Sequence, residues 1–343
     1  MIAFTLLVGL PASRAHAAGP TADRNKVGIS LYGSALAWPQ ARLDHELLQV
    51  RRTGATWVRV PLNWATLQMH GRGTYNWAPA DRVIGSARAH HLFVLPVVSY
   101  TPSWARPAGT PSTNPPTDPA DYASFLAHAA KRYGPLGVHR WELWNEPNLQ
   151  TMWTPFPNAA KYTALLQAGF FGVKSADASA MVITGGLSPA WNAPDHTQIA
   201  PYSFLYGMYR SGAHNFFDQV GLHPSTYPYR STYVASWSAF AQAPQLHALM
   251  SSYGDGAKRV CATEIGFPTG TDPRSVTESV QGPYLVEGIR AWQRRSYAAP
   301  IFVYSIVDEG PNIADHYQNF GLVRWSGVNK PAFTVLQTAL LGT

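Results

Sequence analysis

The 343-residue sequence contains very little cysteine and few charged residues. Cys261 is the only cysteine, so no intramolecular disulfide can form and stability must come from the packed core. Charged residues make up 13% of the chain and hydrophobic residues 46%, which excludes a disordered or fibrous protein. The formal net charge of +7 is spread along the chain apart from two short arginine pairs, which argues against a nucleic-acid-binding protein.

Several motifs of common enzyme classes are also missing. The chain has 12 histidines, but none belongs to an H-E-x-x-H or H-x-H metal-binding motif. It has no G-x-S-x-G sequence, which excludes the serine hydrolases that use this turn. The first apolar segment, VGISLYGS at 27 to 34, is not followed by the glycine-rich turn that binds dinucleotide phosphates. We therefore expect neither a metal ion nor a cofactor.

The N-terminal residues resemble an export signal. An apolar stretch from Ile2 to Leu10 is followed by Ala15, His16 and Ala17, which predicts a signal peptide over residues 1–17 with cleavage after Ala17. No basic residue precedes this stretch, which leaves three alternatives: a true start upstream of Met1, an uncleaved anchor, or a hydrophobic tail without a targeting role. Nine apolar residues are too few to span a bilayer, so we expect no stable membrane span. Residues 18–26 are then a linker, and the protein is expected to be secreted or held in the cell envelope.

Short apolar segments alternate with amphipathic segments through the rest of the chain. Helices are predicted over 43–54, 79–91, 121–134 and 159–176, where apolar residues recur with helical spacing. Strands that are apolar throughout indicate a parallel sheet covered on both faces, and eight of them predict a closed (β/α)8 TIM barrel in one domain, 27–343. The predicted strands are 27–33, 56–62, 93–100, 138–145, 181–186, 217–223, 259–264 and 300–306.

Two of these strands end in a glutamate. Glu146 follows the strand in WELWNEPN, and Glu264 ends the strand in KRVCATEIGFPT, 118 residues later. This distance corresponds to three βα units, so the glutamates end strands four and seven, whose C-terminal ends meet at the face where active sites of this fold lie. The Asn-Glu-Pro sequence alone could equally begin a helix. Two carboxyl groups about 5 Å apart across this face could cleave a glycosidic bond with retention of configuration.

These motifs resemble those of glycoside hydrolase clan A, with W-x-x-W-N-E-P on strand four and T-E-x-G on strand seven. Families 39 and 5, the latter cellulase-like, are the most similar, and the resemblance covers nearly everything after the predicted signal. It implies that Glu146 is the acid/base, Glu264 the nucleophile and Asn145 the group that binds the sugar 2-hydroxyl. Arg59, in WVRVPLNW, matches the clan's strand-two arginine beside the nucleophile. We expect this arginine to keep Glu264 ionised, and Glu146 to stay protonated.

The resemblance extends to further substrate-binding residues, with two departures from the clan pattern. His223, in GLHPSTYP, matches a strand-six histidine, but the tyrosine that usually follows at H-x-Y is displaced by two residues to Tyr227. Strand eight, in IFVYSIVDEG, lacks the tryptophan often found in family 5. Tyr304 or Asp308 is expected to form that wall of the site instead.

Aromatic residues follow nearly every predicted strand. Because sugar rings pack their C–H groups on aromatic faces, such residues are candidate sugar contacts. Packing of the loops on the barrel would explain any single one equally well. The candidates are Trp38, Trp64, Tyr100, Trp104, Trp153, Trp191, Tyr227 and Trp325.

The sequence thus predicts an exported, monomeric, retaining glycosidase that acts on an oligosaccharide or polysaccharide through Glu146 and Glu264. Its basic character would draw it to an anionic cell-wall glycan. A transglycosylase with the same residues and a catalytically silent glycan-binding barrel are the alternatives.

Overall fold

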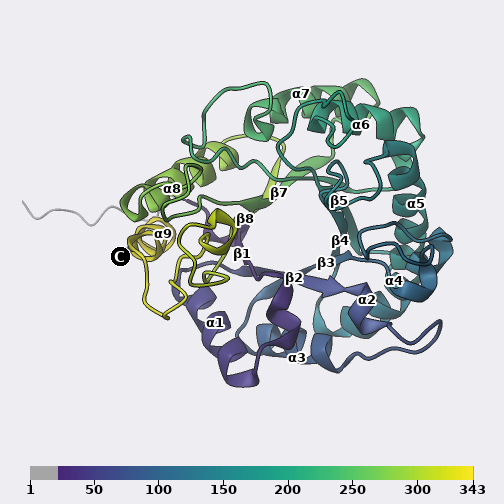
Figure 1. Ribbon diagram of the computed structural model, residues 1–343, viewed down its shortest axis with the longest axis horizontal. Coiled ribbons are helices and arrows are strands. Elements are labelled where there is room, and N and C mark those ends of the chain that lie inside the picture. Colours follow the sequence, from purple (N-terminus) through teal and green to yellow (C-terminus); the bar gives the residue numbers. More distant parts are fainter. Residues whose placement is uncertain (1–21, 343) are drawn as a thin grey trace, which may run out of the picture.

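The computed structural model describes residues 22–342 and contains a closed barrel of parallel strands (Figure 1). The strands are β1 (Val27–Ser30), β2 (Trp57–Asn63), β3 (Phe93–Ser99), β4 (Arg140–Asn145), β5 (Met181–Gly186), β6 (Gln219–Leu222), β7 (Arg259–Ile265) and β8 (Ala298–Tyr304). They pair in chain order, and β1 pairs with β8 to close the barrel. This confirms the predicted single-domain (β/α)8 barrel.

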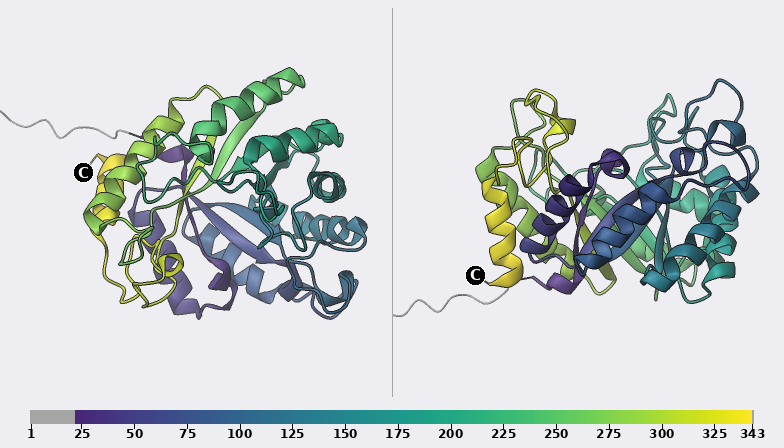
Figure 2. Two further views of the ribbon diagram at one scale, coloured as in Figure 1. Left: turned by 45° about the horizontal axis from the view of Figure 1, so that its top comes forward. Right: turned by 90° about the horizontal axis from the view of Figure 1, so that it is seen from below.

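Helices surround the barrel on its outer side (Figure 2). They are α1 (Gln40–Arg52), α2 (Trp64–Leu67), α3 (Ala78–Ala89), α4 (Pro119–Tyr133), α5 (Ala159–Ala176), α6 (Pro201–Arg210), α7 (Ala239–Ser252), α8 (Glu278–Gln293) and α9 (Pro331–Leu341). The four predicted helices are present, with small shifts at their ends. For example, α4 begins two residues early because the side chain of Asp118 accepts a hydrogen bond from Ala120 N and caps the helix there.

The barrel interior is apolar toward the end where the strands begin. Leu95, Ile183, Cys261 and Phe302 form a small buried cluster there, separate from the larger core between strands and helices. The ring of Phe302 lies where a side chain at Gly28 would be, since a Cβ at that position would come within 2.4 Å of the ring. Cys261 is buried as expected for a small apolar residue, and burial raises the pKa of its thiol.

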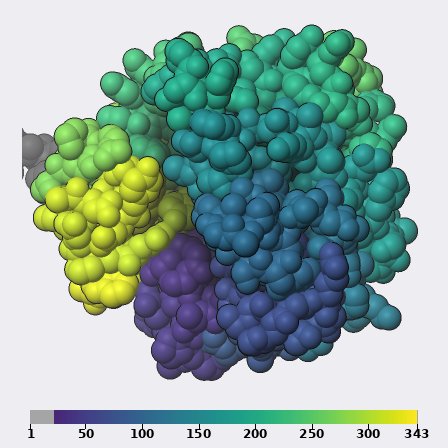
Figure 3. Space-filling model, turned by 45° about the vertical axis from the view of Figure 1, so that its right-hand side comes forward, coloured from purple at the N-terminus to yellow at the C-terminus, as the bar shows by residue number. Residues whose placement is uncertain are grey.

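Loops gather at the end of the barrel where the strands finish, which we call the mouth. The loop between β8 and α9 is the longest of these loops. In the space-filling view, the C-terminal segment (yellow) lies against the N-terminal elements (purple) (Figure 3). The opposite end of the barrel, the base, is where the described chain begins. These positions fix which residues can reach a site at the mouth.

The start of the described chain packs against the base. Ala22 N donates to Ala339 O, and the backbone of Asp23 exchanges hydrogen bonds with the side chain of Gln293. The described part of the predicted linker, residues 22–26, is therefore attached to the domain. The predicted signal peptide, residues 1–17, lies outside the described residues. Among residues 22–342, no helix combines the length and apolar character needed to cross a membrane.

Candidate active site

The end of β4 places two adjacent side chains, Asn145 and Glu146, in one pocket at the mouth. In a regular strand, successive side chains point to opposite faces. Here Trp144 and Glu146 have positive φ angles, 76° and 45°, a conformation that is uncommon for residues other than glycine. Glu146 N donates to Gly186 O on β5, which holds the turn in place. The irregular backbone thus allows both side chains to serve the same site.

Arg59 on β2 connects strands four and seven below the pocket. Its Nε and Nη2 atoms donate to the two carboxylate oxygens of Glu142, at 2.6 and 3.1 Å, and Nη2 also donates to Asn145 Oδ1 at 2.7 Å. Its Nη1 donates to Glu264 Oε1. Burial alone would lower the pKa of Arg59, but Glu142 and Glu264 together raise it above its usual value. The arginine is therefore a permanent cation beside Glu264, as predicted.

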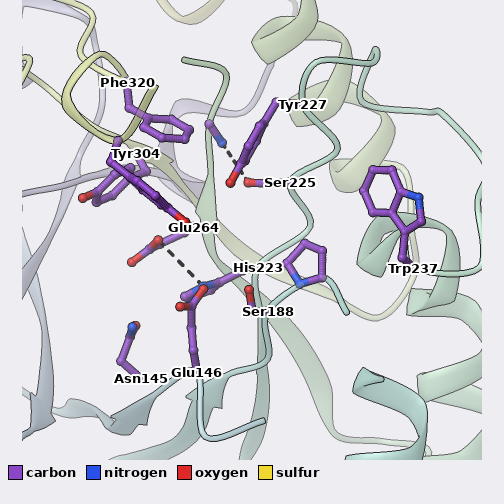
Figure 4. A pocket seen from close by; sticks show the side chains of 13 residues that line it. Asn145, Glu146, Ser188, His223, Ser225, Tyr227, Trp237, Glu264, Tyr304 and Phe320 are labelled. Atoms are coloured by element: carbon purple, nitrogen blue, oxygen red, sulfur yellow. Dashed lines mark hydrogen bonds and ion pairs between the residues drawn. The ribbon is translucent and has the colours of Figure 1, made fainter. Parts of the chain in front are cut away.

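His223 lies between the two candidate catalytic carboxylates (Figure 4). Its Nδ1 atom is 2.9 Å from Glu146 Oε1 and 3.7 Å from Glu264 Oε2. The two oxygens therefore cannot be farther apart than the sum of these distances. This limit on the nearest oxygens is compatible with the separation of roughly 5 to 5.5 Å between the carboxyl groups of retaining glycosidases.

The protonation of Glu146 differs from the sequence-based expectation. Burial acts to raise the pKa of Glu146, but the hydrogen bond and charge of His223, with smaller effects of Ser188 and Arg59, lower it below its usual value. For His223, burial acts to lower the pKa, but Glu264 and Glu146 raise it above its usual value. The shift of the Glu146 pKa therefore runs opposite to the increase expected from the sequence, because the imidazole of His223 lies directly beside this carboxylate.

The pocket itself is a cavity of about 370 Å³. In Figure 4, Glu146, Glu264 and His223 lie at its centre, Tyr304 and Phe320 at one end and Trp237 at the other. It is lined by Asn145, Glu146, Ser188, Pro189, His223, Ser225, Tyr227, Trp237, Glu264, Gly266, Tyr304, Tyr317 and Phe320. This volume is within the range of small-molecule sites and could enclose part of a sugar chain.

Tyr227 and Tyr304 are the predicted aromatic residues that reach the pocket. Tyr227 packs edge-on against Phe320 with ring centroids 5.2 Å apart. The position two residues after His223, where the clan has a tyrosine, is occupied by Ser225, whose hydroxyl accepts a hydrogen bond from Gly266 N at 3.2 Å. Tyr304 forms part of the wall after β8, as expected, and its hydroxyl donates to Glu309.

The predicted tryptophans do not line the pocket. Trp38, Trp64 and Trp153 are almost completely buried, because they pack in the layer between the loops and the helices. Trp104 is half-buried and donates from Nε1 to Gln68 O at 2.6 Å. Trp191 is 56% exposed but is absent from the pocket lining. The alternative reading, packing of loops on the barrel, describes the buried ones correctly.

Asp308 is also placed away from the pocket. Its side chain is buried and accepts hydrogen bonds from Lys330 Nζ at 2.7 Å and from Gly321 N at 2.8 Å. Lys330 in turn donates to Thr269 Oγ1 at 2.9 Å. This buried pair ties the loop after β8 to the start of α9. The predicted substrate contact is therefore corrected to a structural role.

Sequence reasoning missed two further carboxylates. Glu142 is fully buried on β4 and, besides Arg59, accepts a hydrogen bond from Gly186 N at 3.0 Å. A signal for it existed, because a glutamate inside an apolar strand needs a partner and Arg59 interrupts β2 in the same way. Glu309 follows β8 behind Tyr304. Burial, and less strongly Glu264, raise the pKa of Glu309, while the Tyr304 hydrogen bond lowers it, with a net increase.

Comparison with known proteins gives the family. The model of the cellulase family, glycosyl hydrolase family 5, matches residues 22–244. No curated protein sequence matches the chain. Among residues 22–342, no group of three or more histidine, cysteine, aspartate or glutamate side chains could hold a metal ion.

Solved structures share the fold at low sequence identity. A family 39 glycoside hydrolase from Bacteroides cellulosilyticus WH2 has a TM-score of 0.73 and 22% identity, and the match covers 93% of this chain and 64% of that one. A monomeric β-xylosidase from Caulobacter crescentus CB15 has a TM-score of 0.70 and 19% identity, with 93% and 69% covered.

A GH5_18 protein from Bifidobacterium longum subsp. longum, in complex with Manβ1-4GlcNAc, has a TM-score of 0.67 and 16% identity, with 92% and 78% covered. The chain thus spans a little under two thirds of the first of these three structures. These neighbours share the barrel, and the family model covers more than half of the chain. The chain therefore belongs to the cellulase family, glycosyl hydrolase family 5, a family of glycosidases.

Proposed function

We propose that the protein is an exported, retaining glycoside hydrolase that cleaves O-glycosidic bonds in an oligosaccharide or polysaccharide. The observation that carries the proposal is the position of Glu146 and Glu264 on either side of one nitrogen atom of His223. The closeness of the two carboxylates is compatible with a double displacement in which Glu264 is the nucleophile. Family membership supports the class of reaction.

In the first step, a Glu264 oxygen attacks the anomeric carbon while the bond to the leaving oxygen breaks. Glu146 donates its proton to that oxygen, and a covalent glycosyl ester forms on Glu264. In the second step, the Glu146 carboxylate accepts a proton from water, whose oxygen attacks the same carbon and releases Glu264. Arg59 is paired with Glu264 and stabilises its carboxylate when it is released as the leaving group.

His223 supports the exchange of this proton. When the leaving group is bound, it brings an oxygen acceptor beside Glu146, and the proton shared between His223 and Glu146 can shift to the carboxyl. A neutral His223 would then remain, while Glu146 acts as the acid. The proximity of the two groups, 2.9 Å, supports this role.

The charges around the pocket favour a neutral sugar over an anionic one in the catalytic position. Arg59 is already paired with Glu142 and Glu264, and Glu309 adds a carboxylate that accepts a hydrogen bond from the Tyr304 hydroxyl. A sugar carboxylate would therefore meet like charge. Attraction of the basic protein as a whole to an anionic polymer is a separate part of the proposal, supported only by the net charge of +7.

Trapping the covalent intermediate tests the mechanism. Wild type, Glu264→Gln and the control Asp44→Asn, which alters a surface carboxylate on α1, are incubated with dinitrophenyl 2-deoxy-2-fluoro-β-glucoside and the matching β-xyloside. Intact-mass spectrometry should find one added sugar on wild type and on the control, located on the Glu264 peptide, and none on Glu264→Gln. Products of inverted configuration by NMR, or an adduct elsewhere, would refute the double displacement.

Glycan products test the reaction class. Wild type is incubated with xylan, β-glucan and mannan, and products are identified by mass spectrometry. Hydrolysis adds one water per bond cleaved, whereas chains longer than the starting ones would identify a transglycosylase. Binding without any product would identify a glycan-binding barrel. Export is tested by expressing residues 1–343 in a bacterium and sequencing the N-terminus of the secreted protein, which is expected to start at Ala18.

A further inference from the structure

The loop between β6 and α7 carries an aromatic surface that begins inside the pocket and continues outside it. Trp237 lines the pocket. Its ring centroid is 6.3 Å from that of Tyr233 and 6.4 Å from that of Tyr229, and the two tyrosine rings stack at 4.2 Å with an interplanar angle of 14°. We call Trp237, Tyr233 and Tyr229 the aromatic platform.

The two tyrosines of the platform are exposed, and Trp237 is partly buried. Tyr229 is 46% exposed and Tyr233 38%, and their neighbour Val234 is 80% exposed. Other tryptophans near the mouth, such as Trp64 and Trp153, are buried. A contiguous group of exposed aromatic residues that continues from a pocket is typical of a ligand-binding surface.

Polar contacts on the opposite side of the loop hold the platform in place. Ser231 Oγ donates to Tyr284 O at 2.6 Å, and Thr232 Oγ1 donates to Glu287 at 2.5 Å. Arg230 forms an ion pair with the same Glu287 on α8. Ser238 caps the start of α7. These contacts anchor the loop to the outer helices, which lowers the entropy cost of binding. The two stacked tyrosines cover one face of each other, so each offers a ligand its other face or its edge.

The position of the platform relative to the catalytic pair assigns it to one side of the scissile bond. Tyr304 and Phe320, from the β8 side, close one end of the pocket, and Trp237 lies at the other, beyond Ser188 (Figure 4). Glu264 is adjacent to the β8 end, since β7 pairs with β8, whereas Glu146 faces Ser188 on the β5 side. The acid donates its proton to the leaving oxygen, so the leaving group extends past Glu146 toward Trp237.

We propose that the aromatic platform binds the sugar units on the leaving-group side of a neutral glycan chain. The indole face of Trp237 matches the C–H face of one pyranose unit, and the stacked tyrosines extend the apolar surface beyond it, so the enzyme would prefer chains over glycosides with small leaving groups. This inference rests on the proposed glycosidase function, and it identifies the substrate as an extended chain.

Binding to an inactive variant tests the platform separately from catalysis. Glu264→Gln is combined with Trp237→Ala, with Tyr233→Ala, or with the control Tyr206→Ala. Tyr206 lies on α6, is 46% exposed like Tyr229 and does not line the pocket. Calorimetry then measures binding of cello-oligosaccharides and xylo-oligosaccharides of increasing length. Circular dichroism confirms that each variant is folded.

Affinity should rise with chain length in Glu264→Gln and in the Tyr206 control. Trp237→Ala should weaken binding of the longest chains about tenfold and leave binding of a monosaccharide unchanged. Equal affinities in the Trp237 and Tyr206 variants, or no binding of either series at any length, would overturn the platform.

Cleavage by the otherwise wild-type enzyme separates this inference from the proposed function. The ratio of kcat/KM on a long oligosaccharide to kcat/KM on a nitrophenyl glycoside should fall about tenfold in Trp237→Ala and stay constant in Tyr206→Ala. An unchanged ratio with active enzyme refutes the platform alone. If the wild type cleaves no substrate but binding still depends on chain length, the proposed glycosidase function is refuted and the platform remains supported.

Discussion

The two catalytic glutamates occupy environments that differ in one respect, the nature of the cation beside each. Glu264 pairs with Arg59, which stays charged at any pH at which the protein is folded and is itself held by buried Glu142. Glu146 pairs with His223, whose charge depends on pH. A permanent cation suits a carboxylate that must remain an anion. A titratable one suits a carboxyl group that must both give and take a proton.

Removing the permanent cation should have the largest effect. Arg59→Met leaves buried Glu142 and Glu264 without their partner, so we expect unfolding free energy to fall by about 3 to 5 kcal/mol and hydrolysis to be almost abolished. Chemical denaturation and initial rates measure both. As a control, Arg132→Met removes a similar pair with Asp81 on the outer surface and should cost less than about 1 kcal/mol. Equal losses would mean that burial does not distinguish the two pairs.

Removing the titratable carboxyl should affect catalysis selectively. Glu146→Ala should lower kcat/KM on an oligosaccharide by roughly 10² to 10⁴, because the leaving oxygen then lacks its proton donor. The first step with a dinitrophenyl glycoside needs no proton, so formation of the intermediate should be nearly unchanged in pre-steady-state measurements. If both substrates lose activity equally, Glu146 is not the acid.

A substitution at Gly186 on β5, which lies against His223, should have a smaller effect. A Cβ at Gly186 would lie 2.2 Å from His223 Nε2 and 2.3 Å from Thr263 Oγ1, so Gly186→Ala must displace the histidine. We expect a loss of about 1 to 3 kcal/mol in stability, together with reduced kcat. Gly85→Ala on the exposed side of α3, where nothing lies within 4 Å of the new Cβ, should retain full activity. An active, equally stable Gly186→Ala would contradict the close packing.

The smallest expected effect is a shift in pH dependence. His223 lowers the pKa of Glu146, so replacing it with glutamine removes a cation and raises that pKa. In wild type, however, the His223–Glu146 pair keeps its shared proton until the pH passes the raised pKa of His223, so losing the histidine should move the alkaline limb of the kcat/KM profile downward. His139→Gln, which alters an exposed pair with Asp177, should leave the profile unchanged. An upward shift in His223→Gln would show that the histidine acts in another way.

The same pair makes stability depend on pH. The folded pKa of His223 is raised, so its contribution is fully present below its usual value of 6.5 and is lost as pH rises through the higher folded value. The folded pKa of Glu146 is lowered, so its contribution is present above its usual 4.5 and is lost as pH falls through the lower folded value. Both contributions are fully present between the two usual values, pH 4.5 and pH 6.5.

The sequence was sufficient to predict the barrel and the placement of Glu146 and Glu264, because eight apolar segments at regular spacing admit few other folds. It could not predict that Asn145 and Glu146 face the same pocket, since this depends on positive φ angles at Trp144 and Glu146. It also assigned the wrong tryptophans to the pocket. Proximity to a strand end does not determine which way a ring points, and Trp237 lies far along its loop.

The attachment of residues 22–26 to the base has a practical consequence for handling the protein. Ala22 is hydrogen-bonded to Ala339 in α9, so both ends of the described chain emerge at the base, on the side opposite the mouth. A support, an affinity tag or a partner domain joined at either end would therefore leave the mouth open. Immobilised enzyme should consequently retain access to polymers that are too large to diffuse, with the aromatic platform turned toward them.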